Sequence, residues 1–240
     1  WSELRIQPIP EGILILSLDI TERTQAELNI KRLYRTLSVL SDINQAIVRT
    51  HDIQAIFEDA CRIAVEKGDF RMAWIGMLDP TTHQVKPVAD AGFTDDYLEK
   101  LNISLDDETR NHGPTATAIR TGQHVIVNDI MHDESMKPWR DNAQRLGYVS
   151  SAGLPLVVFG EPRGAINLYA SEVDFFDAQE IKLIDEMAGD LSFAMEFAEE
   201  EVRRQQAEDK LQRYTKRLEV LHNLDMGLIQ GTSIPELIQT

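Results

Sequence analysis

The chain has 240 residues, of which 42% are hydrophobic, and a formal net charge of −16. This length fits one or two domains, and the excess of acidic groups would repel nucleic acid phosphates and anionic lipid headgroups. We therefore expect neither nucleic acid nor a membrane as a partner. Cys61 is the single cysteine, which excludes an internal disulfide and is compatible with a reducing cytoplasm, where we expect the protein to reside.

The N-terminal residues predict two short strands, and the second of them, ILILSL, is strongly apolar. Because an isolated hairpin is marginal in water, these strands indicate the end of a larger sheet. The turn Asp19-Ile20-Thr21 that follows resembles the end of a PAS domain, where the sheet leads into a signalling helix. We predict a C-terminal PAS-like hairpin over residues 1–21 and a helical linker over residues 22–36.

From Ala26 onward, apolar residues recur in alternating steps of four and three, which is heptad spacing. We expect this helical face, together with part of the last long helix, to form a parallel homodimer. The predicted interface residues are Ile30, Leu33, Leu37, Leu40, Asn44, Ile47, Leu191, Ala194 and Ala198. The alternative is that the helical face covers the domain's own sheet, as amphipathic helices usually do.

The stretch that begins LSVLSDINQ recurs near the C-terminus as LEVLHNLDM, without a gap. Leu37 aligns with Leu218, a separation of 181 residues, and Ile53 aligns with Ile234. Apolar residues mostly face apolar ones between these identities, so we interpret the match as an internal repeat. We expect Asp52 to cap the helix after the first copy and Ser233, with Glu236, to cap the helix after the second.

Strand and helix patterns alternate between the two copies. In chain order we expect strands at FRMAWIGMLD and QVKPVADAG, then a short helix at 94–101. A helix at 114–121 follows, with Pro at its first turn and Gly122 past its end, and then a strand at HVIVNDI and a helix at PWRDNAQRLG. We further expect a hairpin at GLPLVVFGEPRGAINLYAS that turns at 161–164, and a long final helix capped by Asp177 with Glu180. We expect that final helix to continue through the charged run EEEVRRQQAEDK into the second copy.

Seven pieces, in this order and spacing, resemble a GAF domain of bacterial sensory proteins: FRMAWIGMLD, VADAGF, GPTATAIRTG, VNDI, PWRDNAQRLGY, SSAGLPL and GAINLYA. The resemblance implies an α+β fold with a mainly antiparallel sheet flanked by helices, and long terminal signalling helices. It places a GAF domain at residues 37–200, a coiled-coil-like linker at 201–217 and the truncated start of a second GAF domain at 218–240.

Sequence motifs for the common catalytic sites are absent. The chain has no phosphate-binding Gly-rich loop, no His-Glu-x-x-His zinc helix and no Gly-x-Ser-x-Gly nucleophile motif. It also lacks the signatures of histidine kinases and cyclic-dinucleotide enzymes, with which sensory proteins often end. We therefore expect a non-catalytic module whose output domain lies outside this chain.

Cys61 and His112 are the remaining candidates for covalent or metal chemistry. Cys61 lies on an apolar helical side and is expected to fill the core, the alternatives being bilin attachment or thiol redox chemistry, both known in GAF proteins. His112 precedes a helix start and is expected to be a solvated loop residue, the alternative being a haem ligand. We predict no metal site and leave the cofactor open.

Polar and aromatic residues interrupt otherwise apolar strands at Trp74, Asp129, Ser151, Asn167 and Tyr169. A few polar groups among apolar walls are typical of small-molecule sites. We predict that these five residues line a ligand pocket. The alternative is that Trp74 and Tyr169 fill a small core and Asp129 caps a turn. No motif typical of cyclic-nucleotide GAF domains is present.

These observations predict a sensory and regulatory module. It would bind an unidentified small molecule and relay a signal through the helices of a homodimer. Its partners would be a second molecule of the same chain and the neighbouring signalling domains. The competing prediction is a structural spacer that dimerises and binds nothing.

Overall fold

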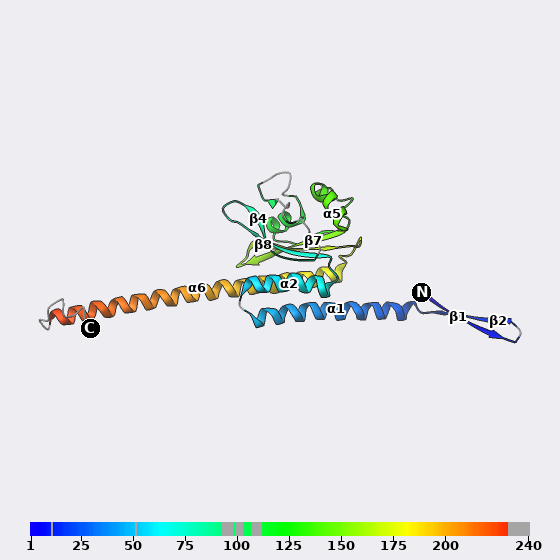
Figure 1. Ribbon diagram of the computed structural model, residues 1–240, viewed down its shortest axis with the longest axis horizontal. Coiled ribbons are helices and arrows are strands. Elements are labelled where there is room, and N and C mark those ends of the chain that lie inside the picture. The colour runs from blue at the N-terminus through cyan, green and yellow to red at the C-terminus, as the bar shows by residue number, and fades with distance from the viewer. Residues whose placement is uncertain (11, 51, 93–97, 99–102, 107–111, 230–240) are drawn as a thin grey trace. The chain divides into compact units, whose positions relative to one another are not determined.

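The computed structural model describes residues 1–229 apart from 11, 51, 93–97, 99–102 and 107–111 (Figure 1). The chain divides into two compact units, Trp1–Ala194 and Met195–Thr240. The last helix, α6 (Ala178–Ile229), belongs to both. Among the described helices, none is long and apolar enough to cross a membrane.

A six-stranded antiparallel sheet forms the centre of the first unit, with the strand order β5-β4-β3-β8-β7-β6. Its strands are β3 (Met72–Leu78), β4 (Gln84–Gly92), β5 (Ile103–Ser104), β6 (Val125–Val127), β7 (Ser150–Val158) and β8 (Glu161–Ala170). A separate hairpin pairs β1 (Ser2–Ile9) with β2 (Gly12–Asp19). The predicted α+β class with a mainly antiparallel sheet is confirmed.

Helices cover both faces of the sheet (Figure 1). One face carries α2 (Ile53–Gly68) and the first part of α6, with α1 (Thr21–Arg49) beneath them. The other face carries α4 (Pro114–Thr121) and α5 (Arg140–Leu146), the latter preceded by a 3₁₀ helix, η1 (Glu134–Trp139). The sheet therefore has a long-helix face and a short-helix face.

The predicted helix caps are present where the structure describes them. Asp52 accepts a hydrogen bond from the Gln54 backbone N–H at the start of α2. Pro114 opens α4, and Gly122 closes it with a left-handed φ of 67°. Asp177 accepts from two backbone N–H groups at the start of α6. The predicted cap at Ser233 lies outside the described residues.

Three predicted boundaries differ from the observed ones. The β7–β8 hairpin turns at Phe159 and Gly160, not at 161–164, because both residues take positive φ and so form the tight turn that suits a twisted hairpin. The strand predicted at HVIVNDI is only the three-residue β6, and the helix predicted at PWRDNAQRLG splits into η1 and α5. The helix predicted at 94–101 lies, apart from Leu98, outside the described residues.

The outer edge of β7 is only partly covered. β6 pairs with Ser151–Gly153 and leaves the following residues of β7 without a described strand on that side. Pro155 has no N–H to offer there, and the Val157 N–H donates to the Ser192 hydroxyl of α6 at 3.0 Å. The exposed half of this edge thus presents few free donors.

The helical face predicted for dimerisation on α1 is largely exposed. Ile30, Leu33 and Leu37 are 53%, 59% and 64% exposed, whereas Leu40 and Ile47 are half-buried and Asn44 is exposed. A different stripe of α1, Val39, Ile43 and Ala46, packs into the core. The part of the predicted face formed by Ile30, Leu33 and Leu37 is therefore not used to cover the domain's own sheet.

The predicted interface residues on α6 have a different setting. Leu191 and Ala194 are buried inside the first unit, so, contrary to the prediction, neither side chain is available to a partner. Ala198, in the second unit, is half-buried. The described part of that unit is helical up to Ile229 and exposes Leu211, Leu218 and Leu221, the counterparts of the α1 face.

Candidate functional site

The strand register brings four of the five predicted site residues together on the short-helix face of the sheet. Trp74 of β3 pairs with Asn167 of β8, and Tyr169 of β8 pairs with Ser151 of β7. Because side chains alternate along a strand, Trp74, Asn167, Tyr169 and Ser151 all point to one face. All four are buried.

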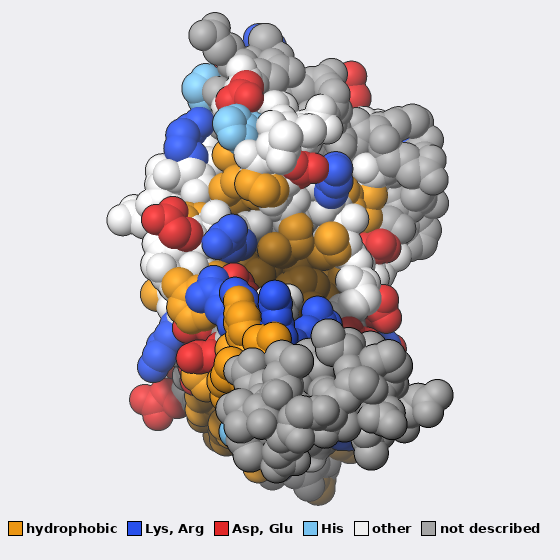
Figure 2. Space-filling model, turned by 90° about the vertical axis from the view of Figure 1, so that its left-hand side faces the viewer, with side chains coloured by type: hydrophobic (Ala, Val, Ile, Leu, Met, Phe, Trp, Pro, Cys, Tyr) orange, Lys and Arg blue, Asp and Glu red, His pale blue; other side chains and the backbone are white. Residues whose placement is uncertain are grey.

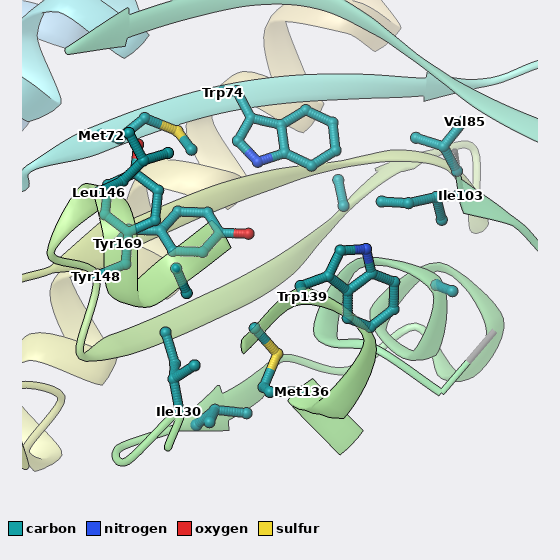
Figure 3. Packing of buried hydrophobic residues seen from close by; sticks show 14 of the residues in the cluster. Met72, Trp74, Val85, Ile103, Ile130, Met136, Trp139, Leu146, Tyr148 and Tyr169 are labelled. Carbon is teal, nitrogen blue, oxygen red and sulfur yellow. The ribbon is translucent and has the colours of Figure 1, made fainter. Parts of the chain in front are cut away.

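An aromatic cluster lies between this face and the short helices (Figure 3). The Trp74 and Tyr169 side chains of the sheet and the Trp139 and Met136 side chains of η1 are directed toward one another. The Tyr148 ring lies 4.8 Å from the Tyr169 ring, measured between centroids. Aliphatic residues complete the cluster, among them Val85, Ile103, Val127, Ile130 and Leu146.

The sequence did not single out Met136, Trp139 and Tyr148 as site residues. The signal was nevertheless present, because Trp139 and Tyr148 are the aromatic residues of the segment PWRDNAQRLGY. The segment is predicted as a helix and as one of the pieces that resemble a GAF domain, but its sequence alone does not show that Trp139 and Tyr148 pack against the sheet.

Two glycines make room for the two indole rings. A Cβ atom at Gly76 would lie 2.6 Å from the Trp74 ring, and one at Gly113 would lie 2.7 Å from the Trp139 ring. Real Cβ atoms do not approach other heavy atoms so closely, so any side chain at either position would displace its tryptophan. The position of both rings therefore depends on these glycines.

Two buried polar atoms on this face lack a hydrogen-bond partner within the described structure. They are Trp74 Nε1 and Ser151 Oγ, on residues that are 1% and 2% exposed. A buried tryptophan N–H usually finds an acceptor, and an unpaired one costs about 1–3 kcal/mol. The aromatic cluster thus contains a donor and a hydroxyl that a bound molecule could satisfy.

Asn167, by contrast, already has partners. The Thr115 hydroxyl of α4 donates to Asn167 Oδ1 at 2.7 Å, and Asn167 Nδ2 donates to the Ala165 carbonyl at 3.3 Å. The first turn of α4 also lies directly on β7, because a Cβ at Gly153 would come within 2.8 Å of the Pro114 backbone. Asn167 therefore fixes α4 to the sheet.

Asp129 lies apart from the other four predicted site residues. It follows β6 in a turn, where its carboxylate accepts from the Met131 backbone N–H and pairs with His132 at 2.7 Å. The hydrogen bond with His132 holds the pKa of the Asp129 carboxyl below its ordinary value. This matches the alternative considered from the sequence, in which Asp129 stabilises a turn.

Cys61 and His112 are both outside the aromatic cluster. Cys61 is fully buried on α2, on the long-helix face, and burial raises the pKa of its thiol well above the usual range. His112 is exposed, and its carbonyl accepts from the Thr117 hydroxyl. Among the described residues, no group of His, Cys, Asp and Glu side chains could hold a metal ion.

An antiparallel sheet with long helices on one face and short helices on the other is the arrangement of the GAF fold. Residues 50–196 match the family model described as the GAF domain. The chain therefore belongs to the GAF domain family. No curated protein matches the chain.

Solved structures with the same fold come from proteins of different kinds. The GAF domain of a phosphoenolpyruvate-protein phosphotransferase from Coxiella burnetii is 16% identical, with a TM-score of 0.59 over 71% of this chain and 98% of that one. The free methionine-R-sulfoxide reductase of Neisseria meningitidis, in complex with its substrate, is 17% identical, with a TM-score of 0.59 over 70% and 91%. At these identities the likeness concerns the fold.

The expectation of a non-catalytic module is corrected by these matches. Free methionine-R-sulfoxide reductases from two organisms, Neisseria meningitidis and Staphylococcus aureus, share the fold, the latter at 12% identity and a TM-score of 0.55. The absence of familiar catalytic motifs could not exclude an enzyme, because those motifs belong to other folds.

Proposed function

We propose that this chain is the sensory and regulatory part of a larger signalling protein, in which a small molecule bound at the aromatic cluster alters the packing of the helices around the GAF domain. The observation that carries this proposal is the pair of buried, unpartnered polar atoms, Trp74 Nε1 and Ser151 Oγ, among aromatic side chains. Ligand sites combine apolar walls with a few such polar groups.

The exposed face of α1 supports a homodimer as the means of relay. Leaving Ile30, Leu33 and Leu37 in water forgoes roughly 1.5–3 kcal/mol for each side chain. A second copy of the same helix would cover them through heptad packing. On the face shown in Figure 2, Lys, Arg, Asp and Glu side chains lie around exposed hydrophobic side chains.

Further signalling domains on either side of the GAF domain complete the proposal. One face of the β1–β2 hairpin exposes a cluster of apolar side chains, with Leu4 and Ile15 each at 62% and Ile6 and Ile13 each at 67%. A PAS-like sheet in the parent protein would cover it. The internal repeat supports a second GAF domain after residue 217. A protein with this arrangement would act in the cytoplasm.

Native mass spectrometry of the intact chain tests ligand binding and dimerisation together. We expect a dimer that retains a small molecule from the expression host. Trp74→Phe keeps an aromatic ring but removes the N–H, and should weaken ligand affinity about tenfold, as expected for a lost buried hydrogen bond of about 1.4 kcal/mol, and so lower the retained fraction of ligand. Leu37→Glu should give monomers, whereas Tyr34→Glu, which changes an exposed residue of the same helix, should not.

Because free methionine-R-sulfoxide reductases share this fold, the same protein is also assayed for reduction of free methionine sulfoxide. Free methionine sulfoxide is added to wild-type protein with a thiol reductant, and formation of methionine is followed. Product formation would assign a reaction to the aromatic cluster if Trp74→Phe also lowers it. A monomer, or a wild-type protein that retains no small molecule and is not stabilised by any probe, would contradict the corresponding part of the proposal.

The second candidate function is a dimeric spacer that binds no ligand. The observation that favours it is the engagement of Asn167 by Thr115, which uses one of the predicted ligand-binding groups for packing. A wild-type dimer that carries no bound molecule would support this function.

A further inference from the structure

The two halves of α1 are held to the first unit by different kinds of contact. The buried apolar residues of α1 are Val39, Ile43 and Ala46, all in its second half. In the first half, the large apolar side chains whose exposure is described, Ile30, Leu33, Tyr34 and Leu37, all face solvent. Apolar burial therefore anchors α1 only from Val39 onward.

Polar contacts attach the first half of α1. Arg35 forms an ion pair with Glu180 in the first turn of α6, and its guanidinium also reaches the Gly68 carbonyl at the end of α2. The same guanidinium lies 5.6 Å from the centroid of the Phe175 ring. One turn earlier, Arg32 pairs with Asp177 at 3.0 Å, in a largely exposed position. Glu180 is the buried member of this set, and Arg35 is half-buried.

The Arg35–Glu180 pair is incompletely satisfied. Arg35 Nε and Glu180 Oε2 are both buried and have no hydrogen-bond partner within the described structure. Glu180 is only 4% exposed. Removing two charges from water is costly, and their attraction repays that cost only when the remaining donors and acceptors are also paired. The pair is therefore close to energetic balance and not strongly stabilising.

Water can reach the pair from one side. A half-open cavity of about 500 Å³ is lined by both residues together with Lys31, Asp69, Asp174 and other charged side chains. If the pair separates, both charged groups can be hydrated without disturbing Val39, Ile43 and Ala46. A detached first half of α1 that is not paired with a second copy would then lose its helical order, since an isolated helix of that length is marginal in water.

We propose that the Arg35–Glu180 pair is a releasable latch, which holds the first half of α1 against α6 in one state and frees it in another, while the second half stays anchored. The latch goes beyond the proposed function, because it names the element with two arrangements that a signal would bias. The helix that enters the GAF domain and the helix that leaves it are joined at this contact.

Hydrogen exchange of the full-length chain, read by mass spectrometry, tests the latch. In the wild type, peptides from residues 22–38 should exchange at least tenfold faster than peptides from residues 39–46. Replacing the pair by apolar residues, Arg35→Met with Glu180→Leu, should slow exchange in 22–38 at least threefold and leave 39–46 unchanged. Breaking the pair with Glu180→Gln alone should accelerate exchange in 22–38 at least threefold.

Arg62→Met is the matched control, because it removes a guanidinium from an exposed ion-paired position on α2 and should leave α1 exchange unaltered. Equal exchange in the two halves of α1, or no slowing in the double variant, would overturn the latch. So would a Glu180→Gln protein that fails to fold, because the pair would then support the whole unit and not one half of a helix.

Discussion

Two buried polar contacts attach helices to this GAF domain, and they are built in opposite ways. Thr115 and Asn167 are neutral, and the Thr115 hydroxyl donates to Asn167 Oδ1 at 2.7 Å, which joins α4 to the short-helix face. Arg35 and Glu180 are charged, join α1 to α6, and each leaves one buried polar atom unpaired. A neutral contact with its atoms paired fixes a helix in place, whereas an incompletely paired charged contact permits release.

The largest effect is expected where α4 meets the sheet most closely. In Gly153→Ala, the new Cβ would lie 2.8 Å from the Pro114 carbonyl carbon, and backbone at that point cannot move aside without shifting α4. We expect a loss of about 2–4 kcal/mol in the free energy of unfolding, measured by chemical denaturation.

Gly189→Ala is the control for that substitution, because a Cβ there meets nothing within 4 Å. It should stabilise the protein by roughly 0.5–1 kcal/mol, since alanine is the better helix former. If Gly153→Ala is as well tolerated as the control, α4 is not fixed in the way described, and the contrast between the two contacts fails.

The next effect concerns the neutral contact itself. Asn167→Leu leaves the buried Thr115 hydroxyl without its acceptor and should cost about 1–3 kcal/mol of folding free energy. Adding Thr115→Val removes the unpaired hydroxyl, so the double variant should recover part of this loss. A double-mutant cycle in denaturant measures the coupling between the two residues. Purely additive losses would show that the hydrogen bond contributes nothing.

The smallest effect is expected at a second polar contact between α1 and α6. Burial, followed by the nearby Glu186, raises the pKa of the Asp190 carboxyl above its ordinary 3.8, while a hydrogen bond with Asn44 opposes the rise. A raised folded-state pKa means that the charged form is disfavoured in the native protein, so this carboxyl costs stability at neutral pH and less as the pH falls through its folded pKa.

Asp190→Asn removes that cost. At pH 7 the free energy of unfolding of the variant should exceed that of the wild type by up to about 1 kcal/mol, which corresponds to a rise in Tm of up to roughly 2–4 °C. The difference should shrink as the pH falls through the raised folded-state pKa and vanish below 3.8, where the wild-type carboxyl becomes protonated in both states. A difference in Tm that does not change with pH would assign the effect to packing.

Local patterns predicted the elements of this domain well, because caps and strands are set by neighbouring residues. Asp52 and Asp177 were identified as caps from the few residues that follow them, and both cap their helices. The hairpin turn was misplaced because Phe159 is an unusual residue at positive φ, and the sequence favoured the Pro and Gly that follow it.

Long-range contacts could not be predicted in the same way. Glu180 was expected to complete a capping box with Asp177, yet its carboxylate pairs with Arg35, from a helix far away in the sequence. Asn167 was expected to bind a ligand, and its partner proved to be Thr115. Polar residues in apolar elements were correctly singled out as unusual, but only the strand register and helix placement decide which group each one meets.

The partly covered edge of β7 bears on whether the sheet of one copy can add strands from another copy at high concentration. A free strand edge is a template on which another chain can add a strand and begin an aggregate. Pro155 removes one donor from that edge, and the Ser192 hydroxyl, which itself donates to the Ala188 carbonyl at 2.7 Å, occupies the Val157 N–H. A serine inside a long helix thus protects the neighbouring sheet from templated growth, a requirement of solubility that is independent of any signal the domain carries.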